Sequence, residues 1–115
     1  MAERRGRERF RCEQPPYSIF VRGIETSVLP TCQKYGMGVI PWSPLAGGLL
    51  SGKFTRDETP SGTRRAMVGD LGIGPVDEAR AWRIIDAGTE IARARGVSLA
   101  QVALNWVRAN ASVSS

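Results

Sequence analysis

In Val39-Ile-Pro-Trp-Ser-Pro-Leu-Ala-Gly-Gly-Leu-Leu-Ser-Gly-Lys53, a short apolar run passes into a loop that is rich in proline and glycine and ends in a cation. The apolar residues before Ser43 are β-branched or aromatic, and their run is too short for a helix. The following prolines and glycines stop any regular element. The segment therefore predicts a buried strand, with a loop that begins at its C-terminal end. Ligands of α/β folds bind at that edge of the sheet, where glycine lets the backbone approach them closely.

The residues before this segment predict one extended stretch and one helix. Residues 14–21 open with two prolines and continue with apolar residues, which favours a strand or an extended arm. Apolar residues then recur every three or four positions over 24–35, and a regular helix is expected from about Leu29, after a looser turn. Gly36 supplies the left-handed position after that helix, and a strand over 38–42 follows.

Two further helices are predicted after a long polar segment at 54–75, and a long loop of this kind is usually functional. The first helix takes Asp77 as its N-cap and ends at Gly96. The second opens with a capping box, in which Ser98 and Gln101 satisfy each other's backbone donors. Its apolar face is most simply a core-packing surface.

Alternating strands and helices indicate an α/β fold with a parallel sheet, but the chain supplies too few strands for one. Two parallel strands and three amphipathic helices leave sheet edges and apolar helix faces uncovered. We therefore expect this chain of 115 residues to be part of a larger α/β domain. Residues 1–11 are expected to form a basic, disordered N-terminal tail, and residues 12–115 the folded part.

Charge is concentrated in the tail, where five arginines lie between Glu3 and Arg11 in a chain of net charge +5. Clustered arginine binds phosphate in a salt-dependent way, so a nucleic-acid arm is one interpretation. The interspersed glutamates, and the lack of a recognised nucleic-acid motif after the tail, favour a solvated terminus without a nucleic-acid partner.

Composition also bears on membranes and metals. No segment approaches the roughly 20 apolar residues of a membrane span, and no apolar targeting segment follows the charged N-terminus. We therefore expect a cytoplasmic protein without a membrane partner. Cys12 and Cys32 lie far apart in a chain without histidine, which leaves no zinc-ligand spacing and no Cys/His catalytic pair. Two free thiols and no metal are expected.

Several blocks of the sequence carry a family resemblance. They are Glu13-Gln-Pro-Pro-Tyr-Ser18, Val28-Leu-Pro-Thr-Cys32, the stretch from Tyr35 to Lys53, Gly62-Thr-Arg64 and Gly96-Val-Ser-Leu-Ala-Gln-Val-Ala-Leu-Asn-Trp-Val107. In order and spacing they resemble the C-terminal half of the aldo/keto reductases, and the resemblance covers nearly everything from Cys12 to the end, whereas residues 1–11 show none. The resemblance implies a fragment of a (β/α)8 TIM barrel that runs from strand 6 to the helix before strand 8.

The resemblance also implies NADP as the cofactor, with hydride transfer between NADPH and a small aldehyde or ketone as the reaction of the full-length family. Gln14 matches the glutamine that hydrogen-bonds the nicotinamide carboxamide, and Trp42 matches the aromatic residue that stacks on the nicotinamide ring. Lys53 and Arg64 match cations near the NADP phosphates. The residues that match the loop around the ribose and pyrophosphate, mainly through backbone donors, are Ser43, Pro44, Leu45, Ala46 and Gly47. From the residues alone, the two cations are most simply solvated charges and Trp42 is equally well a core residue.

No catalytic residue of the family matches this chain. The family's tyrosine acid, lysine, aspartate and histidine come from strands that precede the matching segment. Tyr17 belongs to the Pro-Pro-Tyr-Ser motif and Tyr35 to the end of a helix, so neither matches the catalytic tyrosine. The clamp for the adenine and 2′-phosphate, which follows the eighth strand, is also missing. The chain alone is therefore expected to be inactive.

Two other classes of function are weighed. The residues from Gly47 to Lys53 fit G-x-x-x-x-G-K, the start of a nucleotide-binding P-loop, but Phe54 replaces the Ser or Thr that holds Mg²⁺. Some aldo/keto reductases act as cofactor-binding channel subunits, so a non-catalytic cofactor-binding or interaction subunit is the other alternative. Unpaired strand edges also favour association of the fragment with itself or with a partner.

Overall fold

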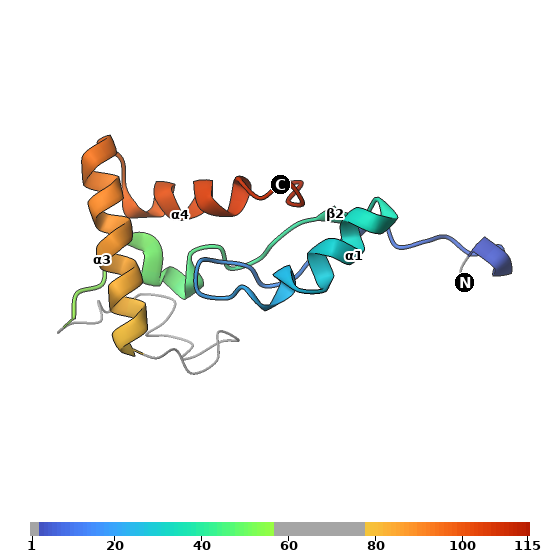
Figure 1. The fold of residues 1–115 in the computed structure, drawn as a ribbon, viewed down its shortest axis with the longest axis horizontal. Coiled ribbons are helices and arrows are strands. Elements are labelled where there is room, and N and C mark those ends of the chain that lie inside the picture. The colour runs from blue at the N-terminus through green and yellow to red at the C-terminus, as the bar shows by residue number, and fades with distance from the viewer. Residues whose placement is uncertain (1–2, 57–77) are drawn as a thin grey trace.

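The computed structural model describes residues 3–56 and 78–115 of the chain. Figure 1 shows an elongated molecule, with the N-terminal segment at one end and helix α3 (Glu78–Arg95) at the other. The Cα radius of gyration is 16.7 Å. A compact domain of about 100 residues has a radius of gyration of about 13 Å. The chain therefore spreads its elements along one axis instead of closing them around one centre.

The sheet consists of two short parallel strands, β1 (Cys12–Glu13) and β2 (Gly38–Val39). Cys12 lies opposite Gly38 and Glu13 lies opposite Val39, and an isolated bridge between Pro16 and Trp42 continues the parallel pairing. The predicted strand over 38–42 is thus confirmed at its start. Prolines limit both strands, because they cannot donate to a sheet ladder.

The extended stretch predicted over 14–21 ends early, and the prediction is wrong beyond Tyr17. Ser18 and Val21 exchange two backbone hydrogen bonds of 3.1 Å. The Ser18 hydroxyl also accepts the amides of Phe20 and Val21, at 3.2 and 3.1 Å. These local bonds from a buried serine compete with strand pairing and turn the chain back toward the next helix.

Helix α1 (Val28–Tyr35) lies close to its predicted position, after the 3₁₀-helix η2 (Gly23–Glu25). Its proline falls in the first turn, where a missing N–H leaves no hydrogen bond unmade. Gly36 has φ 63° and donates to the last carbonyls of the helix. The predicted left-handed end of this helix is confirmed.

The C-terminal part of the molecule is a pair of helices, α3 and α4 (Leu99–Arg108). Asp77, the predicted N-cap of the first, lies outside the described residues. Gly96 has φ 64° and ends α3 as predicted. The capping box of α4 is present: the Ser98 hydroxyl accepts the Gln101 amide at 3.2 Å, and Gln101 Oε1 accepts the Ser98 amide at 2.8 Å.

Among the described residues, two apolar clusters form the core, and α4 contributes to both. The first joins α3, α4 and the 3₁₀ segment η3 (Ala46–Ser51), through Ala46, Leu49, Leu50, Phe54, Ile85, Leu99 and Ala103. The second joins α1, α4 and β2, through Tyr17, Ile24, Leu29, Cys32, Val39 and Val107. Helix α4 runs from α3 toward α1 and β2 (Figure 1) and thereby links the two clusters.

The sheet is covered on one face only. Successive side chains of a strand point to opposite faces. Val39 is completely buried, whereas Ile40 and Trp42 are 41% and 40% exposed. The helices pack on the Val39 side and leave the other side open.

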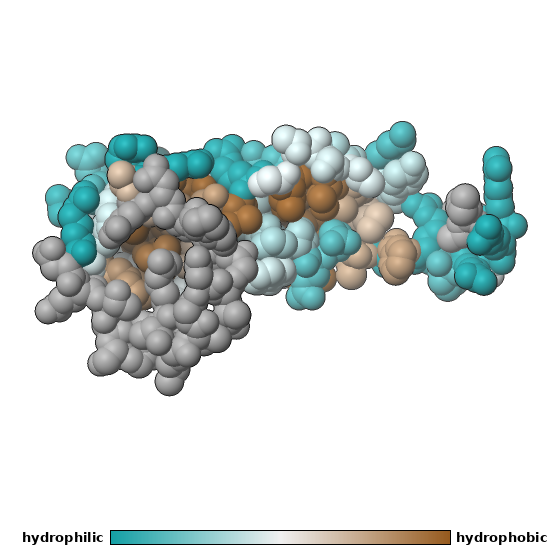
Figure 2. All heavy atoms as spheres, turned by 90° about the horizontal axis from the view of Figure 1, so that it is seen from below, coloured by the Kyte–Doolittle hydropathy of each residue, from teal (hydrophilic) through white to brown (hydrophobic). Residues whose placement is uncertain are grey.

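The N-terminal segment is exposed from Arg4 to Arg11 and contains a 3₁₀ turn, η1 (Glu3–Arg5). Arg9 Nη2 donates to the carbonyl of Tyr35 at 2.8 Å, which attaches the segment to the end of α1. On the face that Figure 2 shows, this end of the molecule is hydrophilic and apolar side chains gather along the middle. Within the described ranges, no helix is long and apolar enough to cross a membrane.

Candidate functional site

Gln14 and Trp42 lie at the same end of the sheet and on the same face. Both follow the C-terminal ends of parallel strands, so they meet at one edge. The register places Gln14 opposite Ile40 and Pro16 opposite Trp42. Since side chains alternate along a strand, these four residues share the open face. The structure therefore brings together an exposed amide and an exposed indole that lie far apart in the sequence.

Both backbone groups of Trp42 form hydrogen bonds to the neighbouring segment, residues 15–17. Its N–H donates to the carbonyl of Pro15 at 3.0 Å, and its own carbonyl accepts the amide of Tyr17 at 3.3 Å. The indole itself is substantially exposed, and the described residues give it no aromatic or cation partner. The hydrogen bonds that hold Trp42 among the described residues are thus those of its backbone.

The loop after Trp42 turns sharply. Ser43 and Ala46 have φ of 57° and 52°, a left-handed conformation that is costly for residues with a Cβ. Gly47 and Gly48 follow with φ of 65° and 102°. Ala46 is completely buried in the first core cluster, which holds this strained turn in place.

Most backbone donors of the loop are used inside the loop. The Ala46 amide donates to the Ser43 carbonyl at 2.9 Å, and the Gly47 amide donates to the Ser43 hydroxyl at 3.3 Å. The Gly48 amide donates to the Leu45 carbonyl at 3.0 Å. The amides of Ala46 and Gly47, which were expected to contact a ligand, are therefore engaged in this conformation. Between Ser43 and Gly48, the amides of Ser43 and Leu45 have no backbone acceptor in the described part of the chain.

The cations near the loop differ in their environments. Lys53 is exposed, and within the described ranges it forms no ion pair. Arg56 instead contacts α3, with Nη2 2.5 Å from Asp86 Oδ2 and its guanidinium 5.2 Å from the Trp82 ring centre. Arg64, the other predicted phosphate ligand, lies outside the described residues.

The loop does not resemble a P-loop. A P-loop wraps its amides around a phosphate and leads directly into a helix. Here Leu49 and Leu50 are buried in the first core cluster, and Lys53 is followed by the buried Phe54 instead of a hydroxyl residue. The nucleotide-triphosphatase alternative therefore loses its structural basis.

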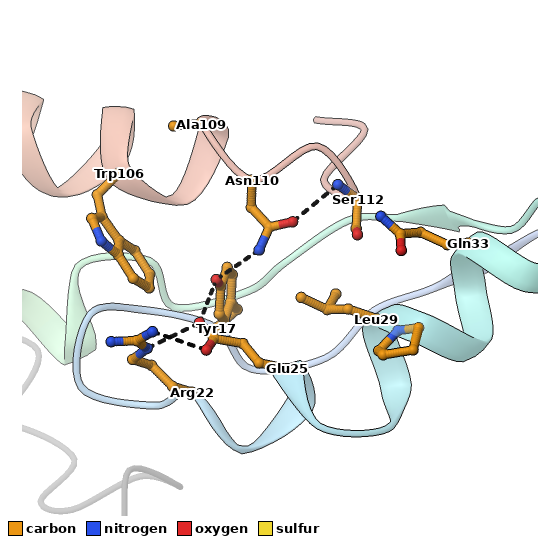
Figure 3. A pocket seen from close by; sticks show the side chains of 10 residues that line it. Tyr17, Arg22, Glu25, Leu29, Gln33, Trp106, Ala109, Asn110 and Ser112 are labelled. Atoms are coloured by element: carbon orange, nitrogen blue, oxygen red, sulfur yellow. Dashed lines mark hydrogen bonds and ion pairs between the residues drawn. The ribbon is translucent and has the colours of Figure 1, made fainter.

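A second group of polar side chains lies on the helix-covered side of the sheet, where it lines a pocket of about 520 Å³ between α1 and α4 (Figure 3). Tyr17 is 2% exposed, and its hydroxyl donates to Glu25 Oε1 at 2.8 Å. Asn110 Nδ2 donates to that hydroxyl at 3.0 Å. Arg22 holds both oxygens of Glu25 at 2.9 Å, and its guanidinium lies 5.2 Å from the Trp106 ring centre.

This network raises the pKa of one side chain and lowers the pKa of another. Burial, followed by donation to Glu25, raises the pKa of the Tyr17 hydroxyl. Hydrogen bonds from Arg22 and then from Tyr17 lower the pKa of the Glu25 carboxyl. Tyr17 is thus a neutral, fully engaged phenol on the side of the sheet opposite Trp42. The Pro-Pro-Tyr-Ser motif pointed to Tyr17 as a matching residue, but no local signal pointed to Asn110.

The described residues hold no group of three or more His, Cys, Asp and Glu side chains that could bind a metal ion. Cys12 is an exposed free thiol and Cys32 a buried one. Both thiols are free, as expected.

Comparison with known proteins places the chain in a family. The sequence model of the aldo/keto reductase family matches residues 1–115. The match includes residues 1–11, for which no resemblance was expected. The chain belongs to the aldo/keto reductase family, whose fold is a TIM barrel.

Individual relatives agree with this assignment. A probable voltage-gated potassium channel subunit beta from Oryza sativa subsp. japonica is 38% identical over 107 residues, which cover 90% of this chain and 32% of that protein. An uncharacterized oxidoreductase from Bacillus subtilis is 40% identical over 98 residues, covering 85% of this chain and 28% of that protein. The solved structure of a glycerol dehydrogenase from Gluconobacter oxydans matches with a TM-score of 0.65 and 33% identity, over 82% of this chain and 28% of that one. The chain therefore spans about a third or less of the length of these relatives.

Proposed function

We propose that this chain is the cofactor-side portion of an NADP-dependent aldo/keto reductase that transfers a hydride between NADPH and a small aldehyde or ketone. One observation carries the proposal. An exposed indole and an exposed carboxamide, Trp42 and Gln14, share the open face at the C-terminal edge of parallel strands. Ligands bind at this edge in barrels of parallel strands.

The residues present fit a nicotinamide cofactor. Trp42 offers a flat apolar face to the nicotinamide ring, and Gln14 offers a donor and an acceptor to its carboxamide. Lys53 is an exposed cation that forms no ion pair with the described residues, which suits it to a phosphate. When bound, the cofactor supplies the hydride, and these residues orient it.

The pyrophosphate loop is the part of the site that fits least well in this conformation. Its amides at Ala46 and Gly47 bond within the loop, so Pro44 and those two residues contribute shape more than donors. We propose that phosphate binding rests on the Leu45 amide, the Ser43 hydroxyl, Lys53 and Arg64.

We further propose that the chain corresponds to the part of the barrel from strand 6 to the helix before strand 8, in a cytoplasmic protein without membrane or nucleic-acid partners. Isolated from the rest of the barrel, it should not reduce carbonyl compounds. Tyr17 is buried with a raised pKa, which makes it a poor proton donor, and it faces away from Trp42. Tyr35 is exposed at the far end of α1.

A second candidate function is a cofactor-binding subunit that does not catalyse. The relative from rice is named as a channel subunit, which supports this alternative. The open sheet face, with Ile40 and Trp42 exposed, also provides an apolar surface for a partner or a second copy. A protein of this class would bind NADPH through the same residues but would not oxidise it in the presence of any carbonyl compound.

The test is an NMR titration of the chain with NADPH. We expect weak binding, at best about millimolar, because stacking contributes about 1 kcal/mol and each charged phosphate contact about 1.5–3 kcal/mol before loop ordering is subtracted. Trp42→Ala and Lys53→Ala should each weaken it, the latter less at high salt. Tyr35→Ala and Lys34→Ala, which remove an exposed aromatic residue and an exposed lysine on α1, are the matched controls. Equal binding by all four variants would refute the cofactor assignment.

A further inference from the structure

We propose that Tyr17 is a positioning residue for Trp42, and that its hydroxyl connects the loop carrying Trp42 to the C-terminal end of α4. The inference rests on the proposed function only where it gives Trp42 a role in cofactor binding. Two contacts of Tyr17 and one of its partner Asn110 carry it, and Figure 3 shows the side chains of Tyr17, Glu25 and Asn110.

The first contact is with Trp42 itself. The Tyr17 amide donates to the Trp42 carbonyl at 3.3 Å, in continuation of the Pro15 to Trp42 bond of 3.0 Å. These two bonds hold the backbone of Trp42 against the segment that carries Tyr17. Any displacement of Tyr17 is therefore passed directly to the backbone of Trp42.

The second contact fixes the other end of Tyr17. Its hydroxyl lies between Glu25 Oε1 and Asn110 Nδ2, at 2.8 and 3.0 Å, so both its donor and its acceptor capacity are used. Its ring lies 5.3 Å from the ring of Trp106 on α4. Arg22 holds the Glu25 carboxylate with two bonds of 2.9 Å, which leaves the hydroxyl little freedom to move.

The third contact brings in the C-terminal segment. Asn110 Oδ1 accepts the amide of Ser112 at 3.0 Å, which turns the chain after α4. The Ser114 amide then donates to the Val39 carbonyl at 2.8 Å, and the Ser114 hydroxyl accepts the Val39 amide at 3.1 Å. Asn110 thus links the Tyr17 hydroxyl to a segment that pairs with β2 three residues before Trp42. One hydrogen-bond network therefore reaches Trp42 twice: directly through the backbone of Tyr17, and along β2 through the bonds between Ser114 and Val39.

The experiment follows the environment of Trp42 by ¹⁹F NMR of the whole chain labelled with 5-fluorotryptophan. The chain has three tryptophans, and Trp42→Phe assigns the relevant resonance. Tyr17→Phe removes only the hydroxyl. We expect it to move the Trp42 resonance toward its position in the urea-unfolded chain. Thr89→Val, which removes one 2.7 Å side-chain hydrogen bond on α3, is the control and should leave the Trp42 resonance in place.

Asn110→Ala gives an independent test, because it removes the other partner of the same hydroxyl. It should move the Trp42 resonance in the same direction, and the double variant with Tyr17→Phe should move it by less than the sum of the two single changes, since both remove the bond between Asn110 and the Tyr17 hydroxyl. An unmoved Trp42 resonance in both single variants would overturn the proposal. So would additive effects, or a Trp42 resonance in the unmodified chain that already coincides with the unfolded one.

Adding NADPH separates this inference from the proposed function. If NADPH perturbs the Trp42 resonance, Tyr17→Phe should weaken that binding about fivefold, which corresponds to about 1 kcal/mol. If Tyr17→Phe moves the resonance but NADPH never does, the positioning role stands and the cofactor role fails. If NADPH binds and Tyr17→Phe changes nothing, the positioning role fails and the cofactor role stands.

Discussion

At the scale of single residues, the loop after Trp42 depends on backbone conformations that most side chains avoid. Gly48 has φ 102°, and a Cβ at this position would lie 3.5 Å from Phe54 Cε2, which is ordinary contact. The cost of a side chain here is therefore one of backbone strain and not of space. We expect Gly48→Ala to reduce the free energy of unfolding by about 1–2 kcal/mol. Gly23→Ala, at a negative φ with open space around it, should be close to neutral in the same urea titration. Equal effects of the two changes would contradict the strain argument.

A second prediction at this scale concerns acid stability. The folded chain lowers the pKa of Glu25, chiefly through its hydrogen bond from Arg22. A depressed carboxyl pKa contributes stability that is present above the unfolded pKa of about 4.3 and is lost as the pH falls through the folded value. Glu25→Gln should therefore flatten the stability profile below about pH 4.3 while the profile between pH 6 and 8 keeps its shape. Urea unfolding at several pH values measures this. If the free energy of unfolding below about pH 4.3 were the same in Glu25→Gln and the original chain, the hydrogen bond from Arg22 to Glu25 would not form in solution.

At the scale of elements, the approach of α3 to α4 is limited by one glycine. A Cβ on Gly88 would lie 2.7 Å from Leu99 Cδ1, and Leu99 is buried, so it has little room to move. Alanine favours a helix over glycine by about 1 kcal/mol, whereas overpacking costs about 1–3 kcal/mol. We expect the clash to prevail, so that Gly88→Ala lowers the thermal midpoint. Adding Leu99→Ala removes the clashing atom, and the double variant should then lose less than the sum of the two single changes. Simple additivity would mean that the helices lie further apart.

The elements that the sequence predicted well are those with local causes. The left-handed glycines at positions 36 and 96 and the Ser98 capping box each depend on residues within one helical turn. The predicted extended stretch over 14–21 was wrong beyond Tyr17 because the Ser18 hydroxyl accepts the amides of Phe20 and Val21. Strand propensity does not indicate such local hydrogen bonds. The edge shared by Gln14 and Trp42 followed from the family resemblance and the parallel register. The Tyr17 to Asn110 bond spans 93 positions of sequence, and no local pattern encodes it.

At the scale of the whole molecule, the open sheet face limits the stability of the chain. The two strands carry few ladder bonds, and apolar side chains such as Ile40 and Trp42 remain exposed on a molecule that measures 56 × 32 × 22 Å. A domain with this surface gains less from burial than a closed barrel does, so its unfolding free energy should be small.

This leads to a prediction about the chain in solution. We expect it to be marginally stable and to associate with itself through the open face, so that its thermal midpoint rises with protein concentration. Ile40→Lys places a charge on that face without touching the buried Val39 side, and it should reduce association measured by sedimentation equilibrium. Ile91→Lys, at an equally exposed apolar position on α3, is the matched control and should leave association through the sheet unchanged. A monomer at all concentrations with a sharp, high thermal transition would contradict the expectation that two strands are too few.

The same preparation should show no NADPH oxidation with aldehydes, because the buried phenol of Tyr17 cannot reach the face on which Trp42 lies.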